Sequence, residues 1–162
     1  MLTVFSLLEK GVSPKSIRVI AEFYPGDITV KYASPLAGAY FCPSSDASVK
    51  KYADYTYQNI DKVLRFLADY ENPGLNECYA TEVFETPLTE TESSLVGKGI
   101  DEFRFLSKEE LDKIGPGLVG GYHCRSLQWN SPVFLSNLYE KFKLLGVVFE
   151  RRKLGSLYEV LD

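Results

Sequence analysis

Histidine and cysteine are scarce in this sequence, and their scarcity excludes whole classes of protein. The 162 residues include one histidine and three cysteines, and Cys42, Cys78 and Cys124 lie far apart with no Cys-x-x-Cys pair. Neither a zinc site nor a disulfide framework is indicated, so we assign no metal-binding residues. This cysteine usage fits a reducing, intracellular compartment.

The sequence also lacks long apolar runs and an excess of basic residues. Its opening apolar stretch ends at Leu8, far short of the ~18 residues that a membrane span needs. This stretch has no basic start and no cleavage site of small residues, so we expect no targeting signal in it. A net charge of −4 argues against nucleic-acid binding, because such proteins usually present a basic face. We therefore expect neither a membrane nor a nucleic-acid partner.

What the sequence does contain is a repeated helix–glycine–strand pattern. The apolar spacing predicts a helix over residues 2–10 that stops at Gly11, followed by an alternating strand over 17–21. Residues 132–145 repeat the pattern after a cap at Ser131, with a stop at Gly146 and a strand over 147–150. Two such units favour an α/β fold with a mostly parallel sheet.

Between these units the pattern changes. A long amphipathic helix is predicted from Asp46 onward, and residues 77–85 have the composition of a strand. We interpret residues 86–99 as an exposed connection, because they are polar and contain glycine. A short helix after Ser107 has Glu110 at the capping-box position, and the run over 118–130 reads as extended.

Glu22 and the small residues near position 38 are the candidate binding residues. A carboxylate directly after the strand over 17–21 can accept both hydroxyls of an adenosine ribose, although an ordinary solvated acid also fits this place. The small side chains of Ala37, Gly38 and Ala39 allow a ligand to approach the backbone closely, and a plain Pro–Gly turn is the alternative. The glycine-rich phosphate turn expected before the first helix is not seen, since only Met1 stands there.

We interpret His123 and the basic cluster over 150–153 as structural rather than catalytic or ligand-binding residues. Neighbours on a strand point to opposite faces, so His123 and Cys124 cannot form a catalytic couple. The basic cluster is expected to be solvated or to pair with nearby acids. We assign no catalytic residues.

Three segments together resemble the D-amino-acid oxidase family of FAD-dependent enzymes, especially its fungal members. YASPLAGAYFCP resembles the family's ASPWAGAN-type flavin loop, with Leu36 for the usual tryptophan and Tyr40 for asparagine. GVVFERRKLGSL is similar to the family's third-strand segment, and GGYHCRSLQWNSPVFLSNL to the extended run and helix before it.

The resemblance implies a partial Rossmann-like FAD-binding sheet with an α+β insertion belonging to the substrate-domain side. It groups the chain into a partial FAD-binding region (1–45), a long helix with the α+β insertion (46–114), and an extended segment, helix and strand that return to the sheet (115–162).

The resemblance also implies roles for the candidate residues. FAD is the implied cofactor, with Glu22 facing its ribose and with Ala37, Gly38 and Ala39 approaching it through their backbone. Phe23 replaces a frequent Arg or Asp of the family at the neighbouring position. The implied reaction is oxidative deamination of D-amino acids, in which hydride passes to the flavin and oxygen reoxidises it.

The same resemblance predicts an internal, truncated piece of such an oxidase, inactive alone. For full-length relatives the resemblance implies a cytoplasmic or peroxisomal location and a D-amino acid as the small-molecule partner. The alternative is a non-catalytic binding or interaction module on a degenerate flavoprotein scaffold. Without a first strand, the strand over 17–21 has an open edge, through which we expect self-association.

Overall fold

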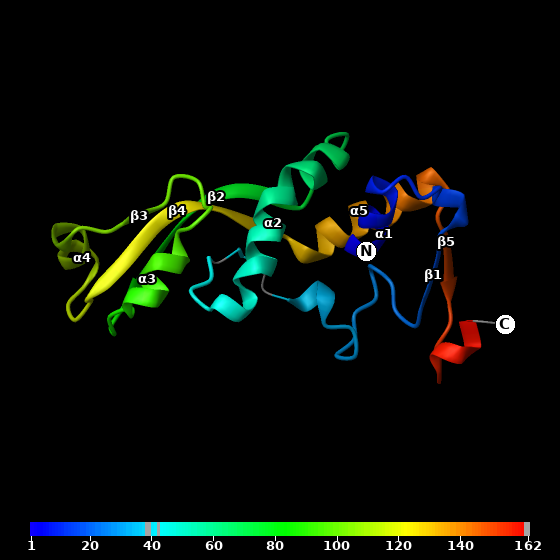
Figure 1. Ribbon diagram of the computed structural model, residues 1–162. Coiled ribbons are helices and arrows are strands. Elements are labelled where there is room, and N and C mark those ends of the chain that lie inside the picture. Colours follow the sequence, from blue (N-terminus) through cyan, green and yellow to red (C-terminus); the bar gives the residue numbers. More distant parts are fainter. Residues whose placement is uncertain (38–39, 42, 161–162) are drawn as a thin grey trace. The chain divides into compact units, whose positions relative to one another are not determined.

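The computed structural model describes residues 1–37, 40–41 and 43–160, and it confirms the α/β class (Figure 1). The chain divides into two compact units, each described here by itself. Unit 1 comprises Met1–Gly38, Leu67–Gly74 and Asn130–Asp162, and unit 2 comprises Ala39–Phe66 and Leu75–Trp129. The three-part grouping expected from the sequence stays a prediction.

Unit 1 is built on a two-stranded parallel sheet. Strand β1 (Arg18–Ala21) pairs with β5 (Val148–Arg151) in a register that places Val19 opposite Phe149. Figure 1 shows the two strands side by side, β1 in blue and β5 in orange-red. Helix α1 (Leu2–Glu9) precedes β1 and α5 (Ser131–Leu145) precedes β5, so both predicted helix–glycine–strand units are confirmed. Three short 3-10 helices complete the unit: η1 (Pro14–Ser16), η2 (Ser34–Leu36) and η3 (Leu157–Val160).

The ends of α5 are determined by local sequence. Its N-cap is Asn130, whose side chain accepts a hydrogen bond from the Val133 backbone N–H at 3.4 Å. The prediction of Ser131 as the cap was wrong, because Ser131 is already the first helical residue. Pro132 fits the first turn, where its missing N–H has no cost. Gly146 ends the helix with φ of 99°, a left-handed conformation that favours glycine.

The apolar stripe of α5 forms the core of unit 1. Leu138 and Phe142 are fully buried, as is Leu67. Burying a side chain of this size contributes about 1.5–3 kcal/mol, so this stripe is a major source of the unit's stability. Phe149 of β5 packs edge-on against Tyr139 of α5, with ring centroids 4.7 Å apart. Strand β5 thus packs on the helix that precedes it in the sequence.

Unit 2 is built on a three-stranded antiparallel sheet. Strand β4 (Gly120–Trp129) lies between β2 (Leu75–Phe84) and β3 (Arg104–Phe105). The prediction of a mostly parallel sheet therefore holds for β1 and β5 alone. The long β2–β4 ladder is antiparallel and joins two segments that lie outside the predicted helix–glycine–strand units.

Three helices accompany this sheet: α2 (Ala47–Phe66), α3 (Glu90–Val96) and α4 (Lys108–Ile114). The capping box of α4 at Ser107 and Glu110 is confirmed. The interpretation of residues 86–99 as an exposed connection missed a helix, because α3 forms there. Thr89 and Glu92 make a second capping box, which satisfies free backbone N–H groups at the start of α3.

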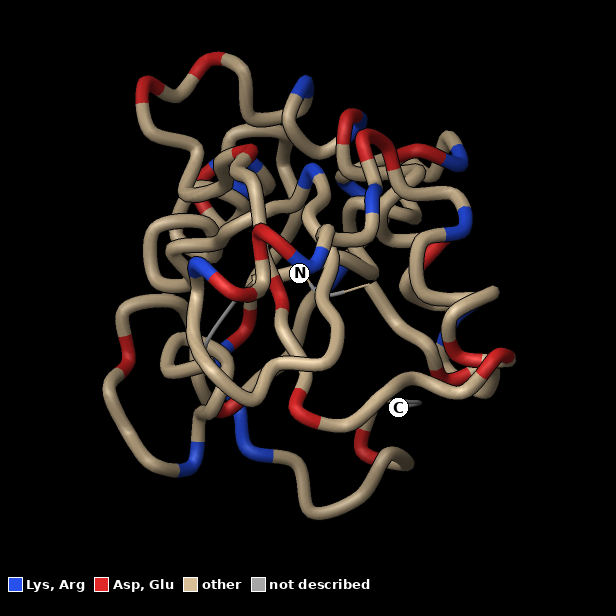
Figure 2. The backbone as a smooth tube through the Cα atoms, turned by 90° about the vertical axis from the view of Figure 1, so that its left-hand side faces the viewer, with Lys and Arg blue, Asp and Glu red and all other residues tan. Residues whose placement is uncertain are grey.

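The sheet of unit 2 has one buried and one exposed face. Tyr122, Cys124 and Ser126 alternate on the buried face, each at most 1% exposed. His123 and Arg125 lie on the other face, beside Tyr79 and Glu77 of β2. Figure 2 shows acidic and basic residues interspersed along the described backbone rather than gathered in one segment of a single sign.

Candidate functional site

The carboxyl end of the parallel pair β1–β5 is the candidate site in unit 1. The carboxyl ends of parallel strands meet at one edge of a sheet, where α/β folds commonly bind ligands. Glu22 follows the last residue of β1 directly and is half-buried. Among the described residues, no hydrogen bond or ion pair engages its carboxylate. This carboxylate therefore remains able to accept hydrogen bonds from a ligand.

The turn that follows Glu22 is held by Arg151, at the end of β5. Its guanidinium donates to both carboxylate oxygens of Asp27, at 2.7 and 3.2 Å, and to the backbone oxygen of Glu22 at 3.2 Å. Asp27 also accepts a hydrogen bond from the Tyr24 backbone N–H at 2.7 Å. The hydrogen bonds from Arg151 and from Tyr24 hold the pKa of the Asp27 carboxyl below its usual value. Arg151 thus positions the backbone from which the Glu22 side chain projects.

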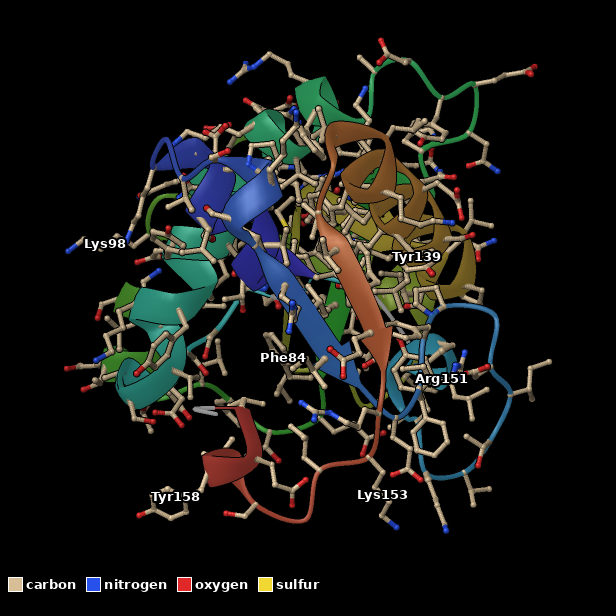
Figure 3. All side chains as sticks on the ribbon, turned by 90° about the vertical axis from the view of Figure 1, so that its right-hand side faces the viewer. Phe84, Lys98, Tyr139, Arg151, Lys153 and Tyr158 are labelled. Atoms are coloured by element: carbon tan, nitrogen blue, oxygen red, sulfur yellow. The ribbon has the colours of Figure 1, made fainter. Side chains whose placement is uncertain are left out.

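An aromatic cluster lies beside this turn. Tyr24 is buried, stacks on Tyr139 at 5.6 Å and meets the edge of Phe149 at 5.7 Å. The guanidinium of Arg151 lies 5.2 Å from the centroid of the Tyr24 ring. Figure 3 shows Arg151 at the end of β5, beside the loop that follows β1. Burial raises the pKa of Tyr24, whose hydroxyl donates to the Val19 backbone oxygen at 3.1 Å.

Ala37 is held by the start of α5. Its backbone oxygen accepts a hydrogen bond from the Ser131 hydroxyl at 3.1 Å, and its side chain is exposed. Gly38 and Ala39 lie outside the described residues. The described contacts do not join Ala37 to Glu22, so the role of these four residues in cofactor binding stays a prediction.

His123 and Cys124 point to opposite faces of β4, as predicted. The His123 ring stacks on Tyr79 at 5.4 Å, and its Nδ1 lies 2.9 Å from the Thr81 hydroxyl oxygen. Cys124 is fully buried on the other face, and burial raises its pKa to about 11. A thiol held in its protonated form is a poor nucleophile. These contacts support a structural role for both residues.

The basic cluster over 150–153 pairs with acids, as predicted. Besides the Arg151–Asp27 pair, Arg152 Nε lies 3.1 Å from Glu150 Oε1. The sequence contains the spacing G-x-G-x-x-G at residues 115–120, a match that the sequence analysis missed. The stretch leads from α4 into β4, whereas a phosphate-binding turn leads from a strand into a helix. It is therefore not a dinucleotide-binding turn.

The part of the chain that the structure describes contains neither a metal-binding cluster nor a membrane-spanning helix. No group of three or more His, Cys, Asp or Glu side chains there could hold a metal ion. No described helix is both long and apolar enough to cross a membrane.

Parallel helix–strand units with an available carboxylate at a strand end are features of dinucleotide-binding α/β folds. No protein-family model matches the chain. D-amino-acid oxidase from Schizosaccharomyces pombe is 25% identical over 165 residues, which cover 100% of this chain and 45% of that oxidase. The chain thus spans about half the length of this curated relative.

A solved structure also shares the fold. L-amino acid deaminase from Proteus vulgaris superposes with a TM-score of 0.61 at 16% sequence identity, over 92% of this chain and 36% of that one. The sequence comparison thus relates the chain distantly to an amino-acid oxidase, and the structural comparison shows a fold shared with an amino-acid deaminase.

Proposed function

We propose that this chain is part of a flavin-dependent amino-acid oxidoreductase of the D-amino-acid oxidase type, and that it contributes the ribose-binding end of the FAD site. One observation carries the proposal: Glu22 stands at the carboxyl end of a parallel strand with its carboxylate free of partners among the described residues. The similarity to a D-amino-acid oxidase along the whole chain supports it.

In the proposed site, Glu22 accepts hydrogen bonds from the two ribose hydroxyls, since an ionised carboxylate offers acceptors only. Arg151 and Asp27 fix the turn that carries Glu22. The Ala37–Ala39 backbone borders the cofactor. FAD supplies the hydride acceptor for oxidative deamination, and the protein supplies its position and its electrostatic surroundings.

The proposal assigns residues of this chain to the ribose of FAD and to the loop at Ala37–Ala39, and it assigns none to the pyrophosphate. A pyrophosphate binds to a glycine-rich turn between a strand and a helix, and the G-x-G-x-x-G spacing at 115–120 lies in a different context. We therefore expect the isolated chain to bind FAD weakly and to be inactive alone. This same observation favours the second candidate, a non-catalytic binding module on a flavoprotein scaffold.

Binding of two nucleotides that differ only in the ribose tests the proposal. We expect the chain to bind AMP about tenfold more tightly than 2′,3′-dideoxy-AMP, because only AMP offers ribose hydroxyls to a carboxylate. Glu22→Gln should reduce this preference, whereas Glu71→Gln, an equal change of charge elsewhere in unit 1, should leave it intact. Titrations followed by NMR or calorimetry would measure the affinities of the two nucleotides for the wild type and for each variant. Equal affinity for the two nucleotides, or no detectable AMP binding, would contradict the proposal.

A further inference from the structure

A carboxylate lies between two tyrosine hydroxyls on the buried face of the unit 2 sheet. Glu82 of β2 accepts a hydrogen bond from the Tyr122 hydroxyl at 2.7 Å and another from the Tyr40 hydroxyl at 2.8 Å. Tyr122 is directly opposite Glu82 in the antiparallel register and is 1% exposed. These two hydrogen bonds orient the Glu82 carboxyl group, which lies among aromatic side chains of the sheet.

An open cavity of about 360 Å³ adjoins this carboxylate. Its volume lies within the ~300–1,000 Å³ range of small-molecule sites. Phe84 and Tyr122 contribute aromatic rings, whose centroids are 5.6 Å apart, and Leu88 and Val96 contribute apolar surface. All of these residues belong to unit 2.

The charged residues among the described lining of the cavity are all acidic. Glu82 and Asp46 line it, and no Lys or Arg is among its described lining residues. Hydrogen bonds from Ser48 keep the pKa of Asp46 below its usual value, so Asp46 is ionised at neutral pH. A carboxylate-bearing ligand would be repelled here, whereas an ammonium group would be attracted both by the carboxylates and by the faces of the aromatic rings.

We propose that this cavity is a binding site for an organic ammonium ion with an apolar or aromatic body and without a carboxylate of its own. Glu82 receives the ammonium group, and Phe84, Leu88 and Val96 surround the apolar body. Glu82 also belongs to the lining of a second cavity, together with Tyr40 and Gln128. The site lies entirely within unit 2, so the proposal does not rest on the FAD site proposed for unit 1.

Three probes of similar size and different charge test the proposal. Calorimetric titration of the whole chain at neutral pH would compare 2-phenylethylammonium, 2-phenylethanol and phenylalanine. The ammonium ion should bind saturably, and the alcohol at least about tenfold more weakly, because it lacks the charge-assisted hydrogen bond. Phenylalanine should bind more weakly than the ammonium ion, since it adds a carboxylate. Equal binding of the alcohol or of phenylalanine would overturn the proposal, as would the absence of saturable ammonium binding.

Variants locate the site. Glu82→Gln should weaken ammonium binding about tenfold or more. Glu77→Gln is the matched control, since it makes the same change on the exposed face of the same strand and should leave binding unchanged. Leu88→Trp fills the cavity without changing its charge and should also abolish binding, so the test stands even where Glu82→Gln does not fold. Unchanged binding in Glu82→Gln or in Leu88→Trp would contradict the proposal.

Discussion

Arg151 holds Asp27 through both carboxylate oxygens, at 2.7 and 3.2 Å, although the two residues are 124 positions apart in the sequence. The pair joins the end of β5 to the turn that follows β1. A bidentate contact of this kind constrains orientation as well as distance. The position of the Glu22 backbone at the strand end therefore depends on a residue of the other strand.

Replacing Asp27 should loosen this turn. In Asp27→Asn we expect the Tyr24 amide to exchange its hydrogen several-fold faster, because this amide donates to the Asp27 carboxylate. Global stability should change little, since exposed ion pairs contribute little. Hydrogen exchange followed by NMR or mass spectrometry measures the effect. Asp69→Asn, which removes the partner of Lys141 in the same unit, is the control. If the Tyr24 amide exchanged at the same rate in Asp27→Asn and in Asp69→Asn, the Arg151–Asp27 pair would not be holding the turn.

The pair Arg104–Glu110 predicts an acid-dependent loss of stability in unit 2. Arg104 donates to both carboxylate oxygens of Glu110, which lowers the pKa of Glu110 from 4.5 to about 2. A lowered carboxyl pKa stabilises the folded state above the unfolded value, and this contribution is lost as the pH falls from about 4.5 toward 2. Chemical denaturation at several pH values measures the free energy of unfolding. Between about pH 4.5 and 2 this free energy should fall less for Glu110→Gln than for the wild type. Glu71→Gln should behave as the wild type does.

Gly74 allows close packing of two backbone segments in unit 1. A Cβ atom at this residue would lie 2.3 Å from the Phe134 backbone nitrogen, and its φ is 72°. We expect Gly74→Ala to cost about 3 kcal/mol or more of unfolding free energy, because a backbone clash adds to conformational strain. Gly26 has φ of 99° and open space around it, so Gly26→Ala should cost only about 1 kcal/mol. Denaturant unfolding would measure both, and equal costs would contradict the packing argument.

Local signals in the sequence predict local structure well in this chain. Gly146 ends α5 and Ser107 begins α4, because caps and left-handed glycines act within a few residues. Helix α3 was missed although Thr89 and Glu92 carry the same capping-box spacing as α4. Its polar surface concealed the signal, since only Val96 of this short helix is buried.

Relationships between distant residues could not be predicted in this way. The antiparallel pairing of β2 with β4 and the Arg151–Asp27 pair depend on tertiary packing. That Glu22 directly follows a strand could be predicted from the pattern of residues 17–22. The availability of its carboxylate could not, because it depends on which partners the fold brings near.

The proposal that this chain forms only part of the FAD site predicts the outcome of an activity assay. With added FAD, the isolated chain should release no peroxide from neutral or acidic D-amino acids, because it spans 45% of the related oxidase and the proposal assigns it no pyrophosphate-binding residues. Positioning of reactants alone is worth about 7–11 kcal/mol of barrier lowering in enzymes, so its loss removes measurable turnover. A peroxide-coupled assay with a catalase control tests this. Turnover that disappears in Glu22→Ala would contradict the prediction and show a complete site.

The free flank of β1 predicts self-association. The Val148 and Arg152 N–H groups donate to Ile17 and Ala21 oxygens, so the Arg18 and Ile20 backbone groups face away from β5. Within the described residues, β1 pairs with no other strand, and an open edge is a template for pairing with another chain.

We expect light scattering to show mass increasing with concentration. Arg18→Pro should reduce the association, because it removes an N–H from the free flank and leaves the β5 ladder intact. Arg18→Ala is its control, since it removes the ion pair with Glu150 but keeps that N–H, and should associate as the wild type does. A monodisperse monomer with a sharp, concentration-independent thermal transition would show that this edge is not used.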